Sequence, residues 1–288
     1  MILHRCENIS TLVQKALRRF VGLNGRVVAE RKKKEFKKME TGNSASLHEN
    51  MSKTERETTT ARYKEPLIII AILLLCTLMM VLADADRKIA GLVLDYNGQW
   101  LTKDSNPWEF IYDYAFFPGF FIMGFALFLL LASLVGESLK KYRRQAMFTI
   151  LLLLLGPGFV VNIALKDNLG RARPSEIKEF GGKHEFTQPW LPGDMGKNSS
   201  FPSGHAAIAF YLFAPWFIFR RQRPRTALFF LASGLCFGIL VSLTRILQGG
   251  HYLSDVLWSG GLVYLIGFFL AVILKVDRVD GIGCKNKK

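Results

Sequence analysis

The chain has 288 residues, a formal net charge of +15 at pH 7, and a composition in which half of the residues are hydrophobic. Its length would allow one or two soluble domains, but several apolar runs are long enough to cross a hydrocarbon layer, which excludes an ordinary soluble fold. A high positive charge is also common in nucleic-acid-binding proteins. Here the basic residues follow a membrane topology instead, so we expect no nucleic-acid partner.

Residues 1–65 are rich in Lys and Arg and contain no long apolar run. The segment 29–40, AERKKKEFKKME, is typical of a solvated or membrane-surface helix. We interpret 1–65 as a basic cytoplasmic leader without a cleavable signal peptide, since the first apolar run begins only at Pro66 and should act as an uncleaved anchor. The membrane domain is expected at 66–275, and a short basic tail at 276–288.

Six apolar segments of about the required length define the fold class. The predicted spans are Pro66–Ala83, Ala115–Val135, Ala146–Leu165, Ser203–Phe219, Thr226–Leu243 and Val256–Leu274. The fourth span is short and carries His205 at its edge. The sequence therefore predicts an all-α, polytopic membrane protein with six transmembrane helices.

The basic residues alternate with these spans and set the orientation. They gather before Pro66, in 136–145, in 220–225 and after Leu274. The positive-inside rule places those segments in the cytoplasm and the loops 84–114, 166–202 and 244–255 outside. In a bacterial inner membrane, the outer loops would face the periplasm.

The four cysteines, Cys6, Cys76, Cys236 and Cys284, are scattered along the chain. Their spacing matches neither a disulfide framework nor a metal-ligand motif. No structural disulfide and no zinc site are therefore expected. The sequence shows no carboxylate cluster to hold another metal, so we expect no cofactor.

Three polar segments lie where spans meet the outer surface: KDNLGRARP (166–174), FPSGH (201–205) and TRILQGGHYLSD (244–255). They contain cations with few local carboxylates, and such a cluster repels itself unless an anion lies among the side chains. Arg offers a planar fork for phosphate and Lys a point charge, while the turn at 203–204 opens a helix whose free N–H groups favour a phosphate. The alternative is simple anchoring of basic side chains at the interface. The candidate phosphate ligands are Lys166, Arg173, Ser203, Gly204 and Arg245.

His205 and His251 adjoin spans, whereas the other three histidines lie in the leader or in a loop. Two histidines that face a cationic cluster suggest a nucleophile and a proton donor. Asp255 follows His251 by four residues, so both share one face if the last helix begins near His251. Asp255 would then fix the imidazole tautomer, and His205, which has no acid nearby in sequence, would be the donor.

Together the three segments resemble the type 2 phosphatidic acid phosphatase (PAP2) superfamily, whose pattern is K-x6-R-P, then P-S-G-H, then S-R-x5-H-x3-D. The first motif is matched by Lys166 with Arg173-Pro174, and the second by residues 202–205. The third is matched by Arg245, His251 and Asp255, with Thr244 where the family usually has Ser. The resemblance covers about residues 66–275.

The resemblance implies roles for the matched positions. His251 would attack phosphorus and form a phosphohistidine, oriented by Asp255. His205 would protonate the leaving oxygen and then activate water. The five candidate phosphate ligands would hold the phosphoryl oxygens, where charge develops in the transition state. No metal would be needed.

The loop 170–190, GRARPSEIKEFGGKHEFTQPW, is similar to the corresponding loop of bacterial lipid A phosphatases. Lys178, Lys183 and Arg171 would add positive charge for a multiply anionic head group. Phe180, Phe186 and Trp190 would dip into the interface or form an ordinary aromatic belt. The expected partners are the bilayer and a membrane lipid phosphate, with lipid A first.

Several alternatives remain open at this point. The substrate could be undecaprenyl pyrophosphate or phosphatidylglycerol phosphate, and the same intermediate could pass its phosphoryl group to a lipid acceptor. A non-catalytic anion or lipid transporter would also suit six spans and an anion site. A transporter would be expected to show paired broken helices near the midplane, whereas the polar residues here crowd one surface.

Overall fold

The computed structural model describes residues 44–95, 97–102 and 105–277. The chain divides into two compact units, Met1–Glu65 and Pro66–Lys288, and the site described below lies in the second. Helix α2 (Ser44–Ala83) begins in the first unit and ends in the second. The expected surface helix at 29–40 and most of the expected tail lie outside the described residues.

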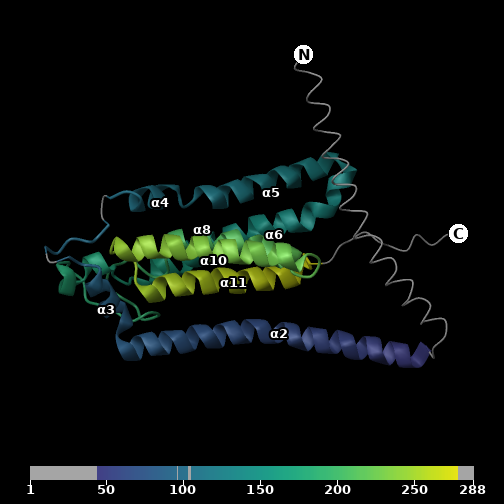
Figure 1. Ribbon diagram of the computed structural model, residues 1–288, viewed down its shortest axis with the longest axis horizontal. Helices are drawn as coiled ribbons and strands as arrows, with labels where there is room; N and C mark the ends of the chain where they lie inside the picture. Colours follow the sequence, from purple (N-terminus) through teal and green to yellow (C-terminus); the bar gives the residue numbers. More distant parts are fainter. Residues whose placement is uncertain (1–43, 96, 103–104, 278–288) are drawn as a thin grey trace, which may run out of the picture. The chain divides into compact units, whose positions relative to one another are not determined.

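The described residues form helices and short turns but no β-strand, which confirms the all-α prediction (Figure 1). After α2 come α3 (Ala85–Leu92), α4 (Trp108–Tyr114), α5 (Phe117–Val135), η1 (Glu137–Tyr142), α6 (Arg143–Leu153), the π-helix η2 (Leu154–Lys166), α7 (Asp167–Leu169), η3 (Pro174–Glu176) and η4 (Lys178–Phe180). The chain ends with α8 (Gly204–Phe210), η5 (Tyr211–Phe213), α9 (Ala214–Phe219), α10 (Pro224–Leu247) and α11 (Leu253–Leu274).

Five helical segments of the described chain are long and apolar enough to cross a membrane. They are Lys64–Ala83, Trp108–Val135, Glu137–Glu176, Pro224–Leu247 and Leu253–Leu274, and each contains a predicted span. The predicted fourth span appears as the shorter apolar stretch Gly204–Phe219. At 1.5 Å per residue this stretch is about 24 Å long, less than the roughly 30 Å of hydrocarbon. The protein is a multi-pass membrane protein.

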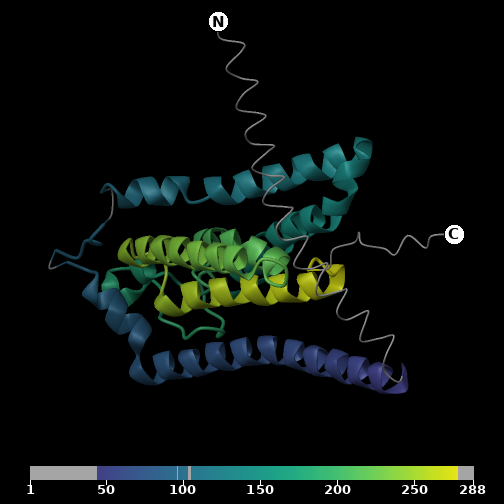
Figure 2. The ribbon, with the colours of Figure 1, turned by 45° about the vertical axis from the view of Figure 1, so that its right-hand side comes forward.

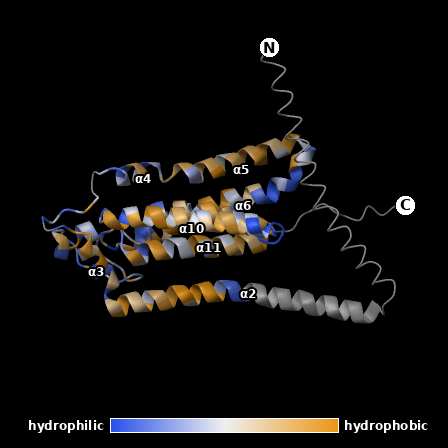
Figure 3. Cartoon of the chain, in the orientation of Figure 1, coloured by the Kyte–Doolittle hydropathy of each residue, from blue (hydrophilic) through white to orange (hydrophobic). Residues whose placement is uncertain are grey.

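Hydrophobic residues run along most of each span (Figure 3), and many of the large ones are exposed. On α5, Phe121 is 77% exposed and Phe128 is 63% exposed, and on α2, Leu82 is 77% exposed. Such surfaces are unfavourable in water and favourable against lipid, where helices also satisfy their backbone hydrogen bonds internally. The lipid-facing surface therefore explains why these helices are apolar on nearly every side.

The helix pair α8–α9 lies inside this bundle rather than against lipid. Ala206, Ala207 and Ala209 are fully buried, and their small side chains allow neighbouring helices to approach closely. On α10, a Cβ added to Gly238 would lie 2.2 Å from the Phe210 ring, so glycine is required for that contact. Because it is enclosed by protein, this stretch need not match the full thickness of the bilayer.

The polar segments gather at one end of the bundle (Figures 1 and 2). The ends of α10 and α7, the start of α11, and the helices α3 and α4 all lie there. The predicted loop 84–114 thus contains two helices rather than irregular chain alone. This common end brings the three predicted motif segments together.

Candidate active site

His251 and Asp255, predicted to act as a pair, lie together at the start of α11. The carboxylate Oδ2 of Asp255 accepts the backbone N–H of Tyr252 at 2.8 Å, which caps the helix. The same oxygen lies 3.5 Å from Nδ1 of His251, at the long end of hydrogen-bond range. An acceptor at Nδ1 favours the Nδ1–H tautomer and leaves the lone pair on Nε2.

The path of the chain into His251 depends on a glycine. Gly249 has a φ of 65°, in the left-handed region that other residues avoid. An added Cβ would also lie 2.2 Å from the Trp100 indole. Trp100 is itself buried and packs on the turn from the segment that precedes α4. Both constraints fix the direction in which the His251 side chain enters the site.

The imidazole of His251 is almost completely buried, with 2% of its surface exposed. Its pKa is lowered to about 4, because burial disfavours the cation more strongly than the hydrogen bond to Asp255 favours it. Arg245 and Lys166 lower the same pKa through repulsion. His251 is therefore neutral at neutral pH, the form in which a nitrogen lone pair can attack phosphorus.

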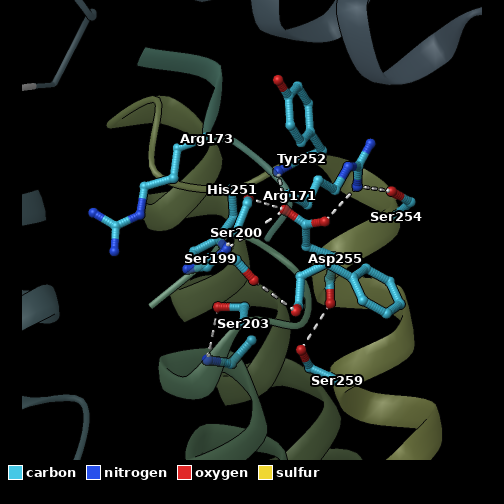
Figure 4. Close-up of polar contacts among 12 residues, drawn as sticks. Arg171, Arg173, Ser199, Ser200, Ser203, His251, Tyr252, Ser254, Asp255 and Ser259 are labelled. Carbon is cyan, nitrogen blue, oxygen red and sulfur yellow. Dashed lines mark hydrogen bonds and ion pairs between the residues drawn. The ribbon is translucent and has the colours of Figure 1, made fainter. Parts of the chain in front are cut away.

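Asp255 is held by more partners than the sequence suggested (Figure 4). The Ser200 hydroxyl donates to Oδ2 at 2.5 Å and lies 3.5 Å from Nδ1 of His251. Nη1 of Arg171 donates to Oδ1 at 2.5 Å. All of these groups are buried, so the carboxylate has its charge and its hydrogen bonds satisfied within the protein.

The prediction that Arg171 offers free positive charge to a head group is wrong. Its side chain is 1% exposed, and its second partner is the buried carboxylate of Asp86 on α3, at 2.9 Å from Nη2. It also donates to the hydroxyl of Ser254 and to the carbonyl of Thr187. A guanidinium surrounded by two carboxylates has its charge balanced internally and is unavailable to a ligand.

The three predicted cations come together near the histidines. Lys166 interacts electrostatically with both Arg173 and Arg245, and all three act on His205. Arg173 donates from Nη2 to the carbonyl of Asn198 at 3.2 Å, and in Figure 4 its guanidinium points away from the Asp255 network. Such a concentration of positive charge favours an anion.

Both arginines also carry a buried N–H without a partner. Nε of Arg173 and Nε of Arg245 have no hydrogen-bond acceptor, although Nη1 of Arg245 donates to Gln248 at 2.6 Å. Unpaired buried donors are costly unless an acceptor fills the space beside them. The arrangement fits a phosphoryl group, whose oxygens accept from planar guanidinium forks.

Ser203 and Gly204 form the start of α8, as the sequence predicted. The Ser203 hydroxyl accepts the N–H of Ala206 at 3.4 Å and so serves as the helix cap. A Cβ at Gly204 would lie 2.5 Å from Oδ1 of Asn162 on the π-helix η2. Within η2, the amide of Asn162 donates to the Pro157 carbonyl at 2.7 Å, which fixes the side chain that packs against the start of α8.

His205 lies in an aromatic slot that the sequence did not reveal. The Tyr112 ring on α4 stacks on its imidazole, with centroids 4.5 Å apart and planes 20° apart. The Phe116 ring lies 4.4 Å away on a tilt of 44°. Tyr112 also lies 4.5 Å from the guanidinium carbon of Arg245. The ring thus touches a predicted proton donor and a predicted phosphate ligand.

The outer loop carries paired charges. Lys178 lies 2.5 Å from Glu185, and both side chains are more than 60% exposed. His184 lies 3.0 Å from Asp194. Surface pairs of this kind stabilise little and remain open to exchange with a ligand. Of the three basic residues expected to contact a head group, Lys183 and Lys178 stay on the surface, whereas Arg171 does not.

The loop aromatics pack against the protein rather than projecting from it. Phe180 contacts Trp100 edge to face, and Phe186 contacts Tyr252 in the same way. Trp190 packs on Phe201 and remains 38% exposed. Of the two roles left open for these aromatics, insertion into the interface does not fit Phe180 and Phe186, which are partly buried and pack against the core.

Thr244 uses its hydroxyl within α10. Its Oγ1 donates to the carbonyl of Leu240 at 3.0 Å, and the residue is fully buried. This bond explains why Thr fits where the PAP2 pattern usually has Ser, since either hydroxyl can make it.

Among the described residues, no group of three or more His, Cys, Asp or Glu side chains is arranged to hold a metal ion. The expectation that phosphate transfer needs no metal stays a prediction, which chelation tests directly.

Residues 146–278 match the PAP2 superfamily, and this stretch contains every site residue predicted from the sequence. The chain is also 38% identical over 151 residues to the lipid A 4'-phosphatase of Francisella tularensis subsp. novicida (strain U112), covering 52% of this chain and 67% of that protein. The chain belongs to the PAP2 superfamily. It is therefore an enzyme of the phosphatase class, as the motif resemblance implied.

Two further proteins are similar to this chain, one in sequence and one in structure. The lipid A 4'-phosphatase of Rhizobium leguminosarum is 38% identical over 133 residues, covering 44% of this chain and 55% of that protein. The crystal structure of a transmembrane PAP2-type phosphatidylglycerolphosphate phosphatase from Bacillus subtilis superposes with a TM-score of 0.41 at 19% identity. That superposition covers 74% of this chain and 97% of the Bacillus chain.

Proposed function

We propose that this PAP2 protein is a lipid A phosphatase that works through a phosphohistidine on His251. The observation that carries the proposal is the neutral, buried His251, which lies against Asp255 beside three cations, two of which, Arg173 and Arg245, carry a buried N–H without a partner. Similarity to lipid A phosphatases supports the choice of lipid.

In the first step, the Nε2 lone pair of His251 forms a bond to phosphorus as the bond from phosphorus to the lipid oxygen breaks. His205, in its protonated form, gives its proton to that leaving oxygen. The Nδ1–H of His251 stays with Asp255, which stabilises the positive charge that develops on the ring. Lys166, Arg173 and Arg245 hold the phosphoryl oxygens, with the backbone of Ser203 and Gly204 beside them.

In the second step, water replaces the lipid alcohol. His205, now neutral, accepts a proton from the water as its oxygen attacks phosphorus. The bond between phosphorus and Nε2 breaks, inorganic phosphate leaves, and His251 regains its lone pair. His205 is again protonated, so both histidines return to their starting states.

The 4' phosphate is the proposed target. Three 4'-phosphatases are 38–40% identical to this chain in the aligned regions, whereas two lipid A 1-phosphatases from Rhizobium are 32% and 35% identical. The aligned regions cover between 38% and 67% of these proteins, so the preference rests on part of each chain.

A substrate panel tests the lipid. Purified protein would be incubated with lipid A, undecaprenyl pyrophosphate, phosphatidylglycerol phosphate and phosphatidic acid, and lipid products would be identified by mass spectrometry. We expect lipid A to lose its 4' phosphate fastest. If lipid A stays intact while another lipid of the panel is cleaved, the assignment of lipid A as substrate is wrong. A phosphorylated lipid acceptor would identify a phosphotransferase. Lipid translocation without phosphate release would instead identify a transporter.

Substitution of the nucleophile tests the mechanism. His251→Ala should abolish phosphate release, and the phosphorylated intermediate should be absent from acid-free gels of the rapidly quenched protein. His184→Ala is the matched control, because His184 pairs with Asp194 in the outer loop. Full activity in His251→Ala would exclude the proposed nucleophile. Activity should also survive EDTA, and strong inhibition by the chelator would point to a metal mechanism.

We also propose that 66–275 is the catalytic domain, with the leader 1–65, the tail and the basic loops in the cytoplasm and the site in the periplasm of a bacterial inner membrane. A cysteine introduced at Lys183 reports on the proposed periplasmic side of the membrane, and one at Arg223 on the proposed cytoplasmic side, since both positions are exposed. In cells, a membrane-impermeant maleimide should label Lys183→Cys and not Arg223→Cys. The reverse labelling would invert the topology.

A further inference from the structure

Two helices that lie before the matched residues 146–278 in the sequence contribute side chains to the site. Residues 146–278 include both histidines and all three cations but neither α3 nor α4. We propose that Asp86 on α3 and Tyr112 on α4 are positioning residues, Asp86 for the His251–Asp255 pair and Tyr112 for His205 and Arg245. The proposal rests on the function proposed above and extends the machinery beyond the family motifs.

Asp86 is connected to Asp255 through a single buried side chain. It is 4% exposed, and its Oδ2 accepts from Nη2 of Arg171 at 2.9 Å. Nη1 of the same guanidinium donates to Asp255 at 2.5 Å. Asp86 also accepts the backbone N–H and the hydroxyl of Ser254, at 3.0 and 2.5 Å, so it fixes the residue next to Asp255.

The net charge of the cluster of Arg171, Asp255 and Asp86 explains what the carboxylate of Asp86 contributes. Arg171 alone would cancel the charge of Asp255 and weaken its attraction for the His251 ring. With Asp86 present, two carboxylates surround one guanidinium, and the cluster keeps a net charge of about −1 to oppose positive charge on the imidazole. That charge arises only when Nε2 bonds to phosphorus, so the benefit falls on the chemical step.

The Tyr112 ring contacts both His205 and Arg245, whose relative orientation matters for the proposed reaction. One face stacks on the His205 imidazole at 4.5 Å, and the ring lies 4.5 Å from the Arg245 guanidinium carbon. Phe116 holds the imidazole from another direction, at 4.4 Å. Stacking of this kind restricts the tilt of both groups, which sets the angle between proton donor and bound phosphate.

Asp86→Asn keeps the shape of the side chain and removes its charge. We expect kcat on lipid A in mixed micelles to fall about 10- to 100-fold, the range for outer partners of an orienting group, with little change in KM. Asp84→Asn is the matched control, because Asp84 is two residues away and pairs with the partly exposed Arg87. Rates are normalised to folded, monodisperse protein. A kcat for Asp86→Asn equal to that of the control would overturn this half of the proposal.

Tyr112→Leu removes the aromatic face, and Tyr112→Phe keeps it. We expect Leu to lower kcat about 10-fold, since a misplaced donor or phosphate ligand slows transfer, and Phe to restore the rate. Tyr114→Leu is the control on the same helix, where Tyr114 stacks on Phe110 and Phe117 outside the site. Equal rates for the Leu variants at 112 and 114, or a failure of Phe to rescue, would overturn the role of the ring.

A measurement without turnover separates this proposal from the function on which it rests. In spectra of isotope-labelled histidine, stacked rings shift the His205 protons upfield, and Tyr112→Leu should reverse part of that shift while Tyr112→Phe should not. Asp86→Asn should likewise change the His251 nitrogen signals, which Asp84→Asn leaves in place. Unchanged signals would refute the positioning roles even if lipid A is cleaved. The expected changes in a protein that cleaves none of the panel lipids would overturn the proposed function alone.

Discussion

The two histidines of the site are held by opposite means. His251 lies against a buried ionic network, in which Asp255 contacts Ser200 and Arg171, and Arg171 contacts Asp86. His205 lies in an apolar slot between Tyr112 and Phe116. A proposed nucleophile that becomes positively charged needs nearby negative charge, whereas a donor that gains and loses a proton needs a fixed direction without a strong ion pair.

The largest loss of activity is expected from removing the carboxylate charge beside His251. Asp255→Asn should lower kcat about a thousand- to ten-thousandfold, because an amide neither fixes the tautomer nor stabilises the charged ring. Steady-state rates on micellar lipid A measure the loss. Ser259→Ala is the control, since the Ser259 hydroxyl donates to the backbone carbonyl of Asp255 and not to its carboxylate. A small effect at Asp255 would mean that the ionic network serves stability alone.

The next largest effect is expected at the centre of the network. Arg171→Lys keeps one charge but cannot reach Asp86, Asp255 and the Thr187 carbonyl together, because the ammonium lacks a planar fork. We expect kcat to fall about 10- to 100-fold and the unfolding temperature to drop by several degrees. Arg87→Lys on the surface should change neither quantity. A variant with lower stability and normal kcat would show that Arg171 does not act on the reaction.

The buried imidazole should also be visible in the pH dependence of stability. The pKa of His251 is lowered to about 4, so between pH 6.5 and 4 the unfolded chain binds more protons than the folded one, and stability falls as pH falls. His251→Asn removes this contribution. Between pH 7 and 5, the unfolding temperature of the unaltered chain should drop about 2–4 °C further than that of the variant. Parallel curves measured in the same detergent would contradict the lowered pKa.

The smallest effect is expected at Thr244. Its hydroxyl donates to Leu240 inside α10, and serine can make the same bond. Thr244→Ser should therefore keep kcat within about twofold. Arg245→Lys, one residue away, provides the contrast and should lower kcat at least tenfold, by roughly the loss of one bidentate phosphate contact. A large loss in Thr244→Ser would indicate that the methyl group supports the site.

The spans and the motif residues could be predicted because each is marked by a pattern within a short stretch of sequence. Apolar runs identify membrane segments, and the four-residue step from His251 to Asp255 places both on one helix face. The assembly of Lys166, Arg173 and Arg245 followed from topology, since alternating loops lie on the same side.

The remaining features depend on contacts that no local pattern records. Asp86 and Arg171 are 85 residues apart, and nothing in either segment indicates that they meet. Arg171 and Arg173 are separated by one residue in the same short segment, GRARP, yet one is buried in an ion network and the other faces the cationic cluster. Tyr112 belongs to no motif in the sequence, and its stacking on His205 becomes visible only once α4 and α8 are packed together.

The Arg171 network also has a consequence for synthesis of the protein. Its partners lie 85 residues before it and 84 residues after it, so the network closes only when the final span is present. That span supplies the acid, and His251 immediately precedes it. On a ribosome that has translated the first five apolar segments, the cations and His205 are already present without His251, the proposed nucleophile. Under the proposed mechanism, a chain that stops there is expected to release no phosphate, and activity is expected only once the last helix is present.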